Sequence, residues 1–448
     1  MATCRLILLL WLLPLPAAMA AELAFVNVNV VGMQDEQVQR EQTVVIRNGR
    51  IVSLGPVRDT QVPDGALVVD GTDRYLLPGL SEMHGHVPAG TSADLERVLI
   101  LYVANGITNV RGMLGSAAHL TLRSDIENGN VIGPRLYTSG PSFNGRSVSS
   151  PHQAAKMVRS QAAAGYDFLK IHPGLTRAEF VAMATAAEKA GIRFAGHVPA
   201  DVGVTLALQQ GIATIDHLDG YMPLLVPTHS AASGGFGGFF DVFLAPYADE
   251  SLLPAVAEAS AEAGVWNVPT QTLFEHLVND EPAQQIAAWP EMKYMPAATV
   301  REWVSRKREL QADADYNSEL AARAISLRRQ LIKALHDAGA GLLLGSDAPQ
   351  VFNVPGFSIH RELAMLVEAG LTPYQALQTG TVNAARWLGH KEETGTLERD
   401  QRADLVLLDD NPLADIANTR RVHGVMLNGR WLDRAALDRL LLPFARQL

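Results

Sequence analysis

The sequence predicts an α/β fold in which a (β/α)8 TIM barrel carries a small β-sandwich domain built from both chain ends. Short apolar segments alternate with helical segments through the middle of the chain. Both ends instead show the apolar/polar alternation of strands. We therefore assign 21–78 and 390–448 to the two parts of the β-sandwich domain, and 79–389 to the barrel.

The two end segments contain tight-turn signals between strand-like runs. The runs are 23–31, 42–47 and 50–54 near the beginning of the chain, and 403–408 and 425–431 near its end. Asn48-Gly49 and Asn428-Gly429 interrupt these runs, and Asn-Gly favours a two-residue hairpin turn. The pattern predicts one sheet domain assembled from both ends, with two unrelated β extensions as the alternative.

Eight apolar segments in the middle of the chain are candidates for the strands of repeated βα units. They are 76–86, 107–113, 135–143, 168–174, 193–199, 214–221, 266–273 and 341–348. A doubly wound open sheet is the alternative, but no G-x-G-x-x-G turn follows the first strand. Two segments are additional to the βα units of a minimal barrel. The glycine-rich 230–240 is either an active-site lid or a plain surface loop, and 275–337 is a helical insertion expected to overhang the site.

The first twenty residues have the features of a secretory signal peptide. Arg5 precedes an apolar run, and Ala18-Met19-Ala20 resembles a cleavage site. An uncleaved membrane anchor is the alternative. Since Cys4 is the only cysteine, the mature chain is expected to form no disulfide. We expect a secreted or periplasmic protein that is free of the membrane after cleavage.

The charge balance favours chemistry on a small molecule. The formal net charge is −10, and the chain has no cluster of lysine and arginine. Such a chain is a poor candidate for binding nucleic acid or an anionic membrane. The expected partner is a small-molecule substrate, and the sequence does not indicate an oligomeric state.

Polar residues gather at the ends of the predicted strands, where barrel enzymes place their active sites. They are His84, His86, Lys170, His197, His217 and Asp347. Because side chains of a strand alternate between its two faces, His84 and His86 point to the same side and can reach one metal ion. His197 and His217, on neighbouring strands, can meet at a second one. Neutral imidazole suits zinc, nickel or manganese.

These residues lie in a set of motifs that resembles the amidohydrolase superfamily, particularly its imidazolonepropionase-like and prolidase-like branch. The motifs are Leu77-Pro-Gly-Leu-Ser-Glu-Met-His-Gly-His86, Phe168-Leu-Lys-Ile171, Gly196-His197, Asp216-His217 and Gly345-Ser-Asp-Ala348, followed by Gly395-Thr-Leu and Ala403-Asp-Leu-Val. The resemblance extends over essentially the whole mature chain. It is specific for the superfamily and says little about the substrate.

The resemblance implies a binuclear centre of two divalent metal ions, with zinc as the first expectation. Its ligands would be His84 and His86 for one metal, His197 and His217 for the other, a carboxylated Lys170 between them, and Asp347 on the first metal. A metal-bound hydroxide would attack the substrate carbonyl, and Asp347 would carry the proton to the leaving group. Locally, Lys170 also fits an interior salt bridge, and Asp347 a turn before Ala348-Pro349.

Other residues are weaker candidates for contacts with the substrate. Tyr221 follows His217 by four residues, and prolidase-like relatives use a tyrosine in this region. Arg146, His152 and His172 lie just beyond the third and fourth strands and could line the pocket. Arg111 departs from familiar relatives because glycine, rather than an acidic residue, follows it.

The sequence thus predicts a metal-dependent hydrolase that cleaves an amide or peptide bond of a small substrate. A dipeptide or an N-acyl amino acid is the expected substrate class. An ester or lactone hydrolase and a cyclic amide hydrolase are alternatives, because the same hydroxide attacks either carbonyl. A non-catalytic periplasmic protein that binds a metal or ligand is the alternative from a different class.

Overall fold

The computed structural model describes residues 22–89, 93–234 and 237–446. The expected signal peptide, 1–20, with its single cysteine Cys4, lies outside the described residues. Among the described helices, none combines the length and the apolar character that crossing a membrane requires.

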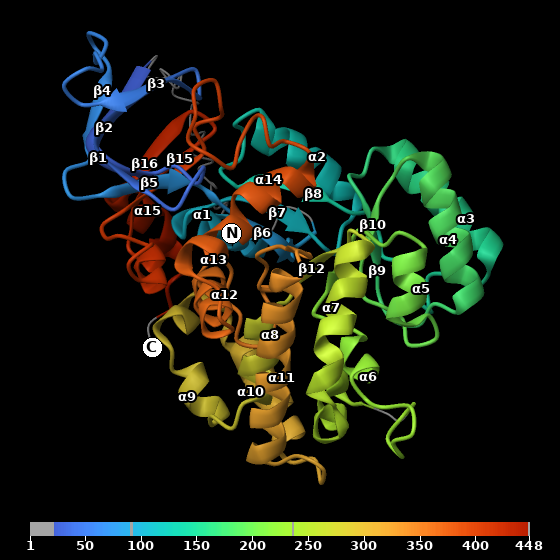
Figure 1. The fold of residues 1–448 in the computed structure, drawn as a ribbon. Helices are drawn as coiled ribbons and strands as arrows, with labels where there is room; N and C mark the ends of the chain where they lie inside the picture. The colour runs from blue at the N-terminus through green and yellow to red at the C-terminus, as the bar shows by residue number, and fades with distance from the viewer. Residues whose placement is uncertain (1–21, 90–92, 235–236, 447–448) are drawn as a thin grey trace, which may run out of the picture.

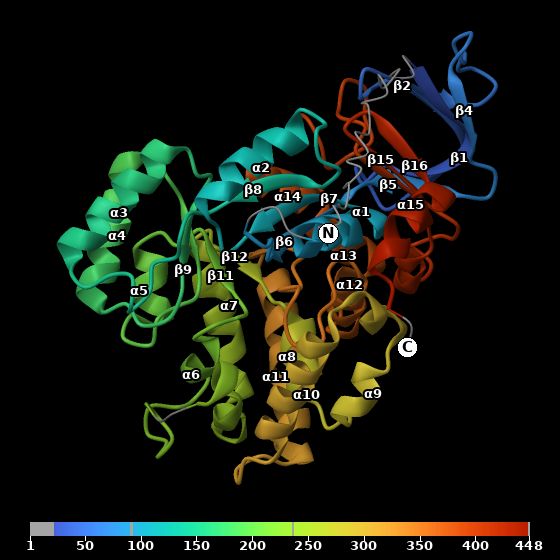
Figure 2. The ribbon, with the colours of Figure 1, turned by 180° about the vertical axis from the view of Figure 1, so that it is seen from behind.

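Strands from both ends of the chain form one mixed eight-stranded sheet, ordered β16-β15-β14-β5-β1-β2-β3, with β4 paired to β1. The strands are β1 (Glu22–Val31), β2 (Val38–Arg47), β3 (Arg50–Pro56), β4 (Leu67–Asp70), β5 (Tyr75–Pro78), β14 (Leu405–Leu408), β15 (Val422–Leu427) and β16 (Arg430–Asp433). The two ends join where β5 pairs with β14 antiparallel, so blue and red strands lie side by side in Figures 1 and 2. A shared apolar cluster that includes Phe25 and Leu405 supports the sheet.

Both predicted hairpin turns are present in this sheet. Asn48 and Gly49 have φ values of 52° and 70°, and Asn428 and Gly429 have 49° and 75°. Positive φ at both central residues is the geometry of a type I′ turn, whose twist matches that of the flanking antiparallel strands. The turns connect β2 to β3 and β15 to β16.

Eight parallel strands form the middle of the chain, in sheets ordered β6-β7-β8 and β13-β12-β11-β10-β9. They are β6 (Leu80–Gly85), β7 (Ile107–Gly112), β8 (Arg135–Thr138), β9 (Leu169–Ile171), β10 (Phe194–Gly196), β11 (Thr214–Asp216), β12 (Trp266–Val268) and β13 (Gly341–Leu342). Bridges from Ser139 to Phe168 and from Phe143 to Ile171 connect the two sheets on one side. On the other side, the backbone N–H of Asp347 donates to the carbonyl of His84 over 2.8 Å. This neighbour order is that of a TIM-barrel-like domain.

The strands are shorter than their predicted segments. Residues 76–78 belong to β5 in the other sheet, and Gly79 separates them from β6. The predicted sixth strand stops at Asp216, because His217 and Leu218 have φ values of 64° and 53°. The predicted seventh strand stops at Val268, two residues before Thr270 at φ 45°. Left-handed backbone ends an extended strand, and the chain continues into helices.

Helices connect the parallel strands, and a helical insertion follows β12 as predicted. The connecting helices include α1 (Ala93–Ala104), α2 (Ala117–Glu127), α3 (Pro151–Ala164), α4 (Arg177–Ala190), α5 (Gly203–Gln209), α6 (Tyr221–Leu224), α7 (Leu253–Glu262) and α12 (Phe357–Glu368). The insertion contains α8 (Gln271–Val278), α9 (Ala283–Ala287), α10 (Ala297–Gln311) and α11 (Ser318–Asp337). In both ribbon views these four helices extend from the barrel strands on the side away from β1 to β4.

Candidate active site

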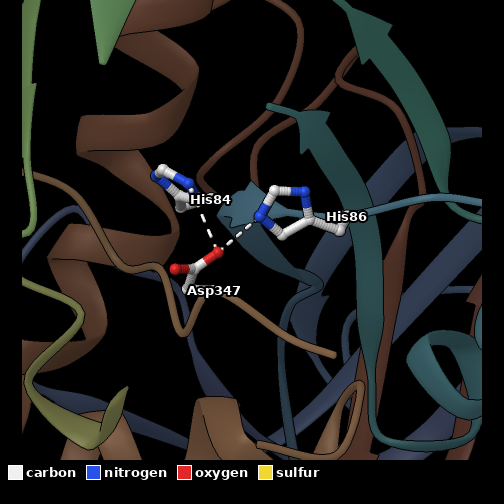
Figure 3. Close-up of side chains that lie close together, drawn as sticks. All are labelled: His84, His86 and Asp347. Carbon is white, nitrogen blue, oxygen red and sulfur yellow. Dashed lines mark hydrogen bonds and ion pairs between the residues drawn. The ribbon is translucent and has the colours of Figure 1, made fainter. Parts of the chain in front are cut away.

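His84, His86 and Asp347 converge where the first and last parallel strands end. His84 lies in β6 and Asp347 follows β13. His86 Nε2 is 2.5 Å and His84 Nε2 is 3.5 Å from Asp347 Oδ1. Dashed lines mark these two contacts in Figure 3. Their ligand atoms lie within 4.8 Å of one another, and the three residues are the one group in the described chain with this geometry. Two imidazoles and a carboxylate at this spacing suit a divalent metal ion.

His217 and His197 lie next to this group. The ring centroid of His217 is 4.4 Å from that of His84 and 4.6 Å from that of His197. His217 Nδ1 is 2.9 Å from Thr270 Oγ1, and His197 Nδ1 is 3.0 Å from Asp219 Oδ2. Since a partner engages Nδ1 of each ring, Nε2 is the nitrogen available to a metal.

Lys170 lies in β9 and is fully buried beside these histidines. Its Nζ atom has no hydrogen-bond partner among the described residues, although Asp216 Oδ2 lies 3.9 Å away. Burial lowers the pKa of Lys170 to about 8, against the opposing influence of Asp216 and Asp347. A buried ammonium without hydrogen bonds is costly, whereas a neutral amine can be carboxylated, and the resulting carbamate offers two oxygens to metal ions. The donor set around His84, His86 and Asp347 therefore fits divalent metal ions.

A buried ion pair between Arg111 and Asp216 lies next to His84. Both Arg111 in β7 and Asp216 in β11 are fully buried. Arg111 Nη2 donates to Asp216 Oδ1 and Oδ2 over 3.1 and 3.2 Å, and His84 Nδ1 lies 2.9 Å from Asp216 Oδ2. Burial alone would raise the pKa of Asp216, but Arg111 and Lys170 outweigh it and hold this pKa below its usual value. Arg111 thus has its acidic partner on another strand, 105 residues away.

Glu82 connects the two strand ends that carry His84 and Asp347. Its carboxyl accepts hydrogen bonds from the backbone N–H of His84 over 3.0 Å, and from the backbone N–H and hydroxyl of Ser346. Burial raises the pKa of Glu82 to about 8, because its hydrogen bonds only partly offset the lost solvation. Sequence reasoning missed this residue, although it lies two positions before His84 in the quoted motif.

The helical insertion holds the backbone of His217 through a buried arginine. Arg328 in α11 donates to the carbonyl of His217 over 2.7 Å and to the carbonyl of Pro269 over 2.9 Å. It therefore ties the left-handed turn at His217 to the turn before Thr270, which contacts the His217 ring. No sequence signal marked Arg328, because the two carbonyls and the Gln271 side chain that accept its hydrogen bonds are distant in the chain.

The structure separates the residues predicted to contact substrate. Tyr221 is fully buried in α6, where its hydroxyl contacts Ser260 and Asn267 over 2.9 Å. This placement argues against a substrate-binding role for Tyr221. Arg146 and His152 are exposed, and in the described chain no hydrogen bond, ion pair or ring contact joins either to the histidines.

His172 and the end of the glycine-rich segment lie against the site. The ring of His172 stacks on His197 with centroids 5.2 Å apart. Phe240 stacks on His217 at 5.0 Å and on His197 at 6.3 Å. Both rings therefore cover faces of imidazoles rather than their in-plane nitrogens. Phe240 places the end of 230–240 at the mouth of the site, where a lid would lie.

Comparison with known proteins connects this arrangement to a family. Residues 75–432 match the model of the amidohydrolase family. The imidazolonepropionase of Idiomarina loihiensis is 23% identical over 94% of this chain and 98% of its own length. Ochratoxinase of Aspergillus niger is 23% identical over 76% of this chain and 71% of its own length.

Two solved structures share the fold. A bottromycin amidohydrolase superposes with a TM-score of 0.72 at 23% identity, covering 95% of this chain and 91% of that one. A Xaa-Pro dipeptidase with methionine bound in its active site gives a TM-score of 0.65 at 19% identity, covering 92% of this chain and 100% of the other.

Proposed function

Because this chain belongs to the amidohydrolase family, we propose that it hydrolyses an amide or peptide bond of a small substrate. Dipeptides and N-acyl amino acids are the proposed substrate class. The observation that carries the proposal is the convergence of three histidines and Asp347, namely His84, His86 and His217 with that carboxylate. Beside them lies the buried Lys170, whose Nζ atom has no hydrogen-bond partner among the described residues. We also infer that the eight parallel strands close into a barrel whose C-terminal mouth holds this site.

The proposed cofactor is a pair of divalent metal ions, with zinc as the first expectation. His84, His86 and Asp347 would hold one ion, His197 and His217 the other, and a carboxylated Lys170 would contact both. Metal ions at such a site lower the pKa of a bound water and polarise the scissile carbonyl. The fully buried ion pair of Arg111 and Asp216 lies beside this ligand set, with Asp216 Oδ2 2.9 Å from His84 Nδ1.

Asp347 is the proposed proton carrier of the reaction. Its carboxylate is almost completely buried, with Oδ1 close to His86 and Oδ2 3.7 Å from His217 Nδ1. From this position it takes the proton of the attacking water and delivers it to the departing amine nitrogen. Thr270 and Asp219 keep the His217 and His197 rings oriented during the reaction.

The same site also suits related reactions. Ester, lactone and cyclic amide carbonyls accept the same attack, so these activities are the alternatives within the family. A secreted or periplasmic location remains our proposal for the mature protein. A non-catalytic periplasmic protein that binds a metal or ligand is the alternative from a different class, and the presence of the complete residue set, including both Lys170 and Asp347, favours catalysis over it.

The proposal is tested with a panel of dipeptides and N-acyl amino acids. We expect the wild-type protein to hydrolyse members of the panel and Asp347→Asn to lose about 10²- to 10⁴-fold in kcat, which is the usual contribution of a general base. Asp337→Asn, which removes an exposed carboxylate on α11, is the matched control and should keep full activity. Full activity of Asp347→Asn would exclude the proposed proton carrier. Metal binding without hydrolysis of any member would favour the binding protein.

A further inference from the structure

A cleft of about 520 Å³ opens onto His86 from the side of the helical insertion. Its walls come from the segments that follow three barrel strands and from one face of α10. The lining residues include His86, Leu114, Gln350, Glu302, Trp303 and Arg306. A substrate whose scissile bond lies beside His86 would therefore extend toward α10.

The cleft combines apolar walls with one permanently cationic side chain. Leu114 is 48% exposed although it is a large apolar residue, and Trp303, which is only 5% exposed, borders the cleft beside it. Arg306 and Glu302 are the lysine-, arginine-, aspartate- or glutamate-type residues among those that line it. An exposed apolar side chain next to a cation is a surface suited to an amphiphilic anion.

Arg306 is available to a ligand because its present partner holds it weakly. Its Nε and Nη2 atoms both donate to one oxygen of Glu302, over 3.2 and 3.1 Å. The two side chains are 58% and 61% exposed, and solvent-exposed pairs one helical turn apart contribute little stability. A ligand carboxylate can instead offer one oxygen to each N–H group of the guanidinium fork, which is the stronger geometry.

Helix α10 is fixed in place on both sides of Arg306. The adjacent Lys307 is fully buried, and its Nζ donates to the carbonyls of His276, Leu277 and Asn279 at the end of α8. Trp303 packs edge-on against Phe352, with ring centroids 6.0 Å apart, five residues beyond Asp347. The distance between Arg306 and the strand ends is therefore set by packed elements.

We propose that Arg306 binds the free carboxylate of the substrate, while Leu114 contacts an apolar side chain of the residue that carries this carboxylate. The inference rests on the proposed function and narrows its substrate class. The substrates would be dipeptides and N-acyl amino acids whose carboxyl-terminal residue is apolar. Glu302 neutralises the arginine in the free protein and releases it to the substrate.

The experiment compares N-acetyl-L-leucine with N-acetyl-L-leucinol, which has the same scissile amide but an alcohol in place of the carboxylate. The wild-type protein should prefer the acid by about 10- to 100-fold in kcat/KM, the range expected for charge-assisted hydrogen bonds. Arg306→Gln should raise KM for the acid by a similar factor, leave kcat within about threefold, and abolish the preference. Arg301→Gln, an exposed arginine on the same helix, is the matched control.

Binding is measured separately by titrating both compounds into the metal-loaded Asp347→Asn variant, with and without Arg306→Gln. If the wild-type protein hydrolyses neither compound, the proposed activity on acylated leucine fails, and the titration still decides the role of Arg306. Equal affinity for acid and alcohol, or an equal loss of both on Arg306→Gln, would overturn the inference. It would also be overturned if Glu302→Gln, rather than Arg306→Gln, weakened binding of the acid.

Discussion

Replacing Arg111 with methionine tests how much the buried ion pair of Arg111 and Asp216 contributes to the free energy of unfolding. Methionine preserves much of the length of the apolar stem, but it removes the guanidinium group, whose carbon lies 4.7 Å from the ring centroid of Trp387. The substitution removes the only guanidinium that contacts Asp216 in the described chain, and leaves this fully buried carboxylate facing His84. Breaking one half of a buried pair typically costs about 3 to 5 kcal/mol. We expect a loss of this size in the free energy of unfolding.

Urea unfolding of the metal-free protein at pH 7, followed by tryptophan fluorescence, measures this loss. Asp216→Leu and the double variant Arg111→Met/Asp216→Leu complete a mutant cycle. The double variant should be destabilised by less than the sum of the single variants, because it leaves neither a buried Arg111 without Asp216 nor a buried Asp216 without Arg111. Arg123→Met breaks a partly exposed pair with Asp167 and should cost less than about 1 kcal/mol. Equal effects of Arg111→Met and Arg123→Met, or strict additivity in the cycle, would refute the reasoning.

Two further predictions concern parts of the molecule outside this pair. Arg328→Met should reduce the number of metal ions per folded chain, measured by elemental analysis, because it releases the backbone of His217. Arg323→Met on the same helix should leave that number unchanged, and equal metal content in both would contradict this role of Arg328. The second prediction is acid sensitivity, because burial lowers the pKa values of His276 and His360 to about 3. Between pH 6.5 and 3 the unfolded chain binds more protons at these two groups, so the unfolding free energy should fall as the pH drops, by at most about 1.4 kcal/mol per pH unit for each histidine. His360→Asn should reduce this slope, and an unchanged slope would exclude the contribution of His360.

Local patterns predicted the features that depend on a few neighbouring residues. Asn48-Gly49 and Asn428-Gly429 specify their turns through the positive φ values that asparagine and glycine tolerate. His84 and His86 were expected together because strand geometry places alternate residues on one face. Strand lengths were overestimated, since nothing in the local sequence around His217 or Thr270 indicated left-handed backbone.

The supporting contacts of the site were not predictable in the same way. Arg111 and Asp216 are 105 residues apart, and Glu82 and Ser346 are 264 apart. These pairs depend on which strands become neighbours and in which register, which a single sequence does not reveal. Tyr221, in contrast, is close to the site in sequence but does not contribute to it in the structure. Its proximity to His217 in sequence suggested a shared pocket, but α6 turns the hydroxyl toward Ser260 in α7.

The measurement that tests the central claim most directly is the metal content of the purified protein and of its Lys170→Ala variant. Lys156→Ala, which removes an exposed lysine on α3, is the control, and circular dichroism establishes that each variant is folded. We predict two divalent ions per chain in the wild-type and control proteins, and loss of at least one ion together with hydrolysis in Lys170→Ala. A wild-type protein that hydrolyses its substrates without bound metal, or a Lys170→Ala variant that keeps both ions and full activity, would contradict the proposed centre.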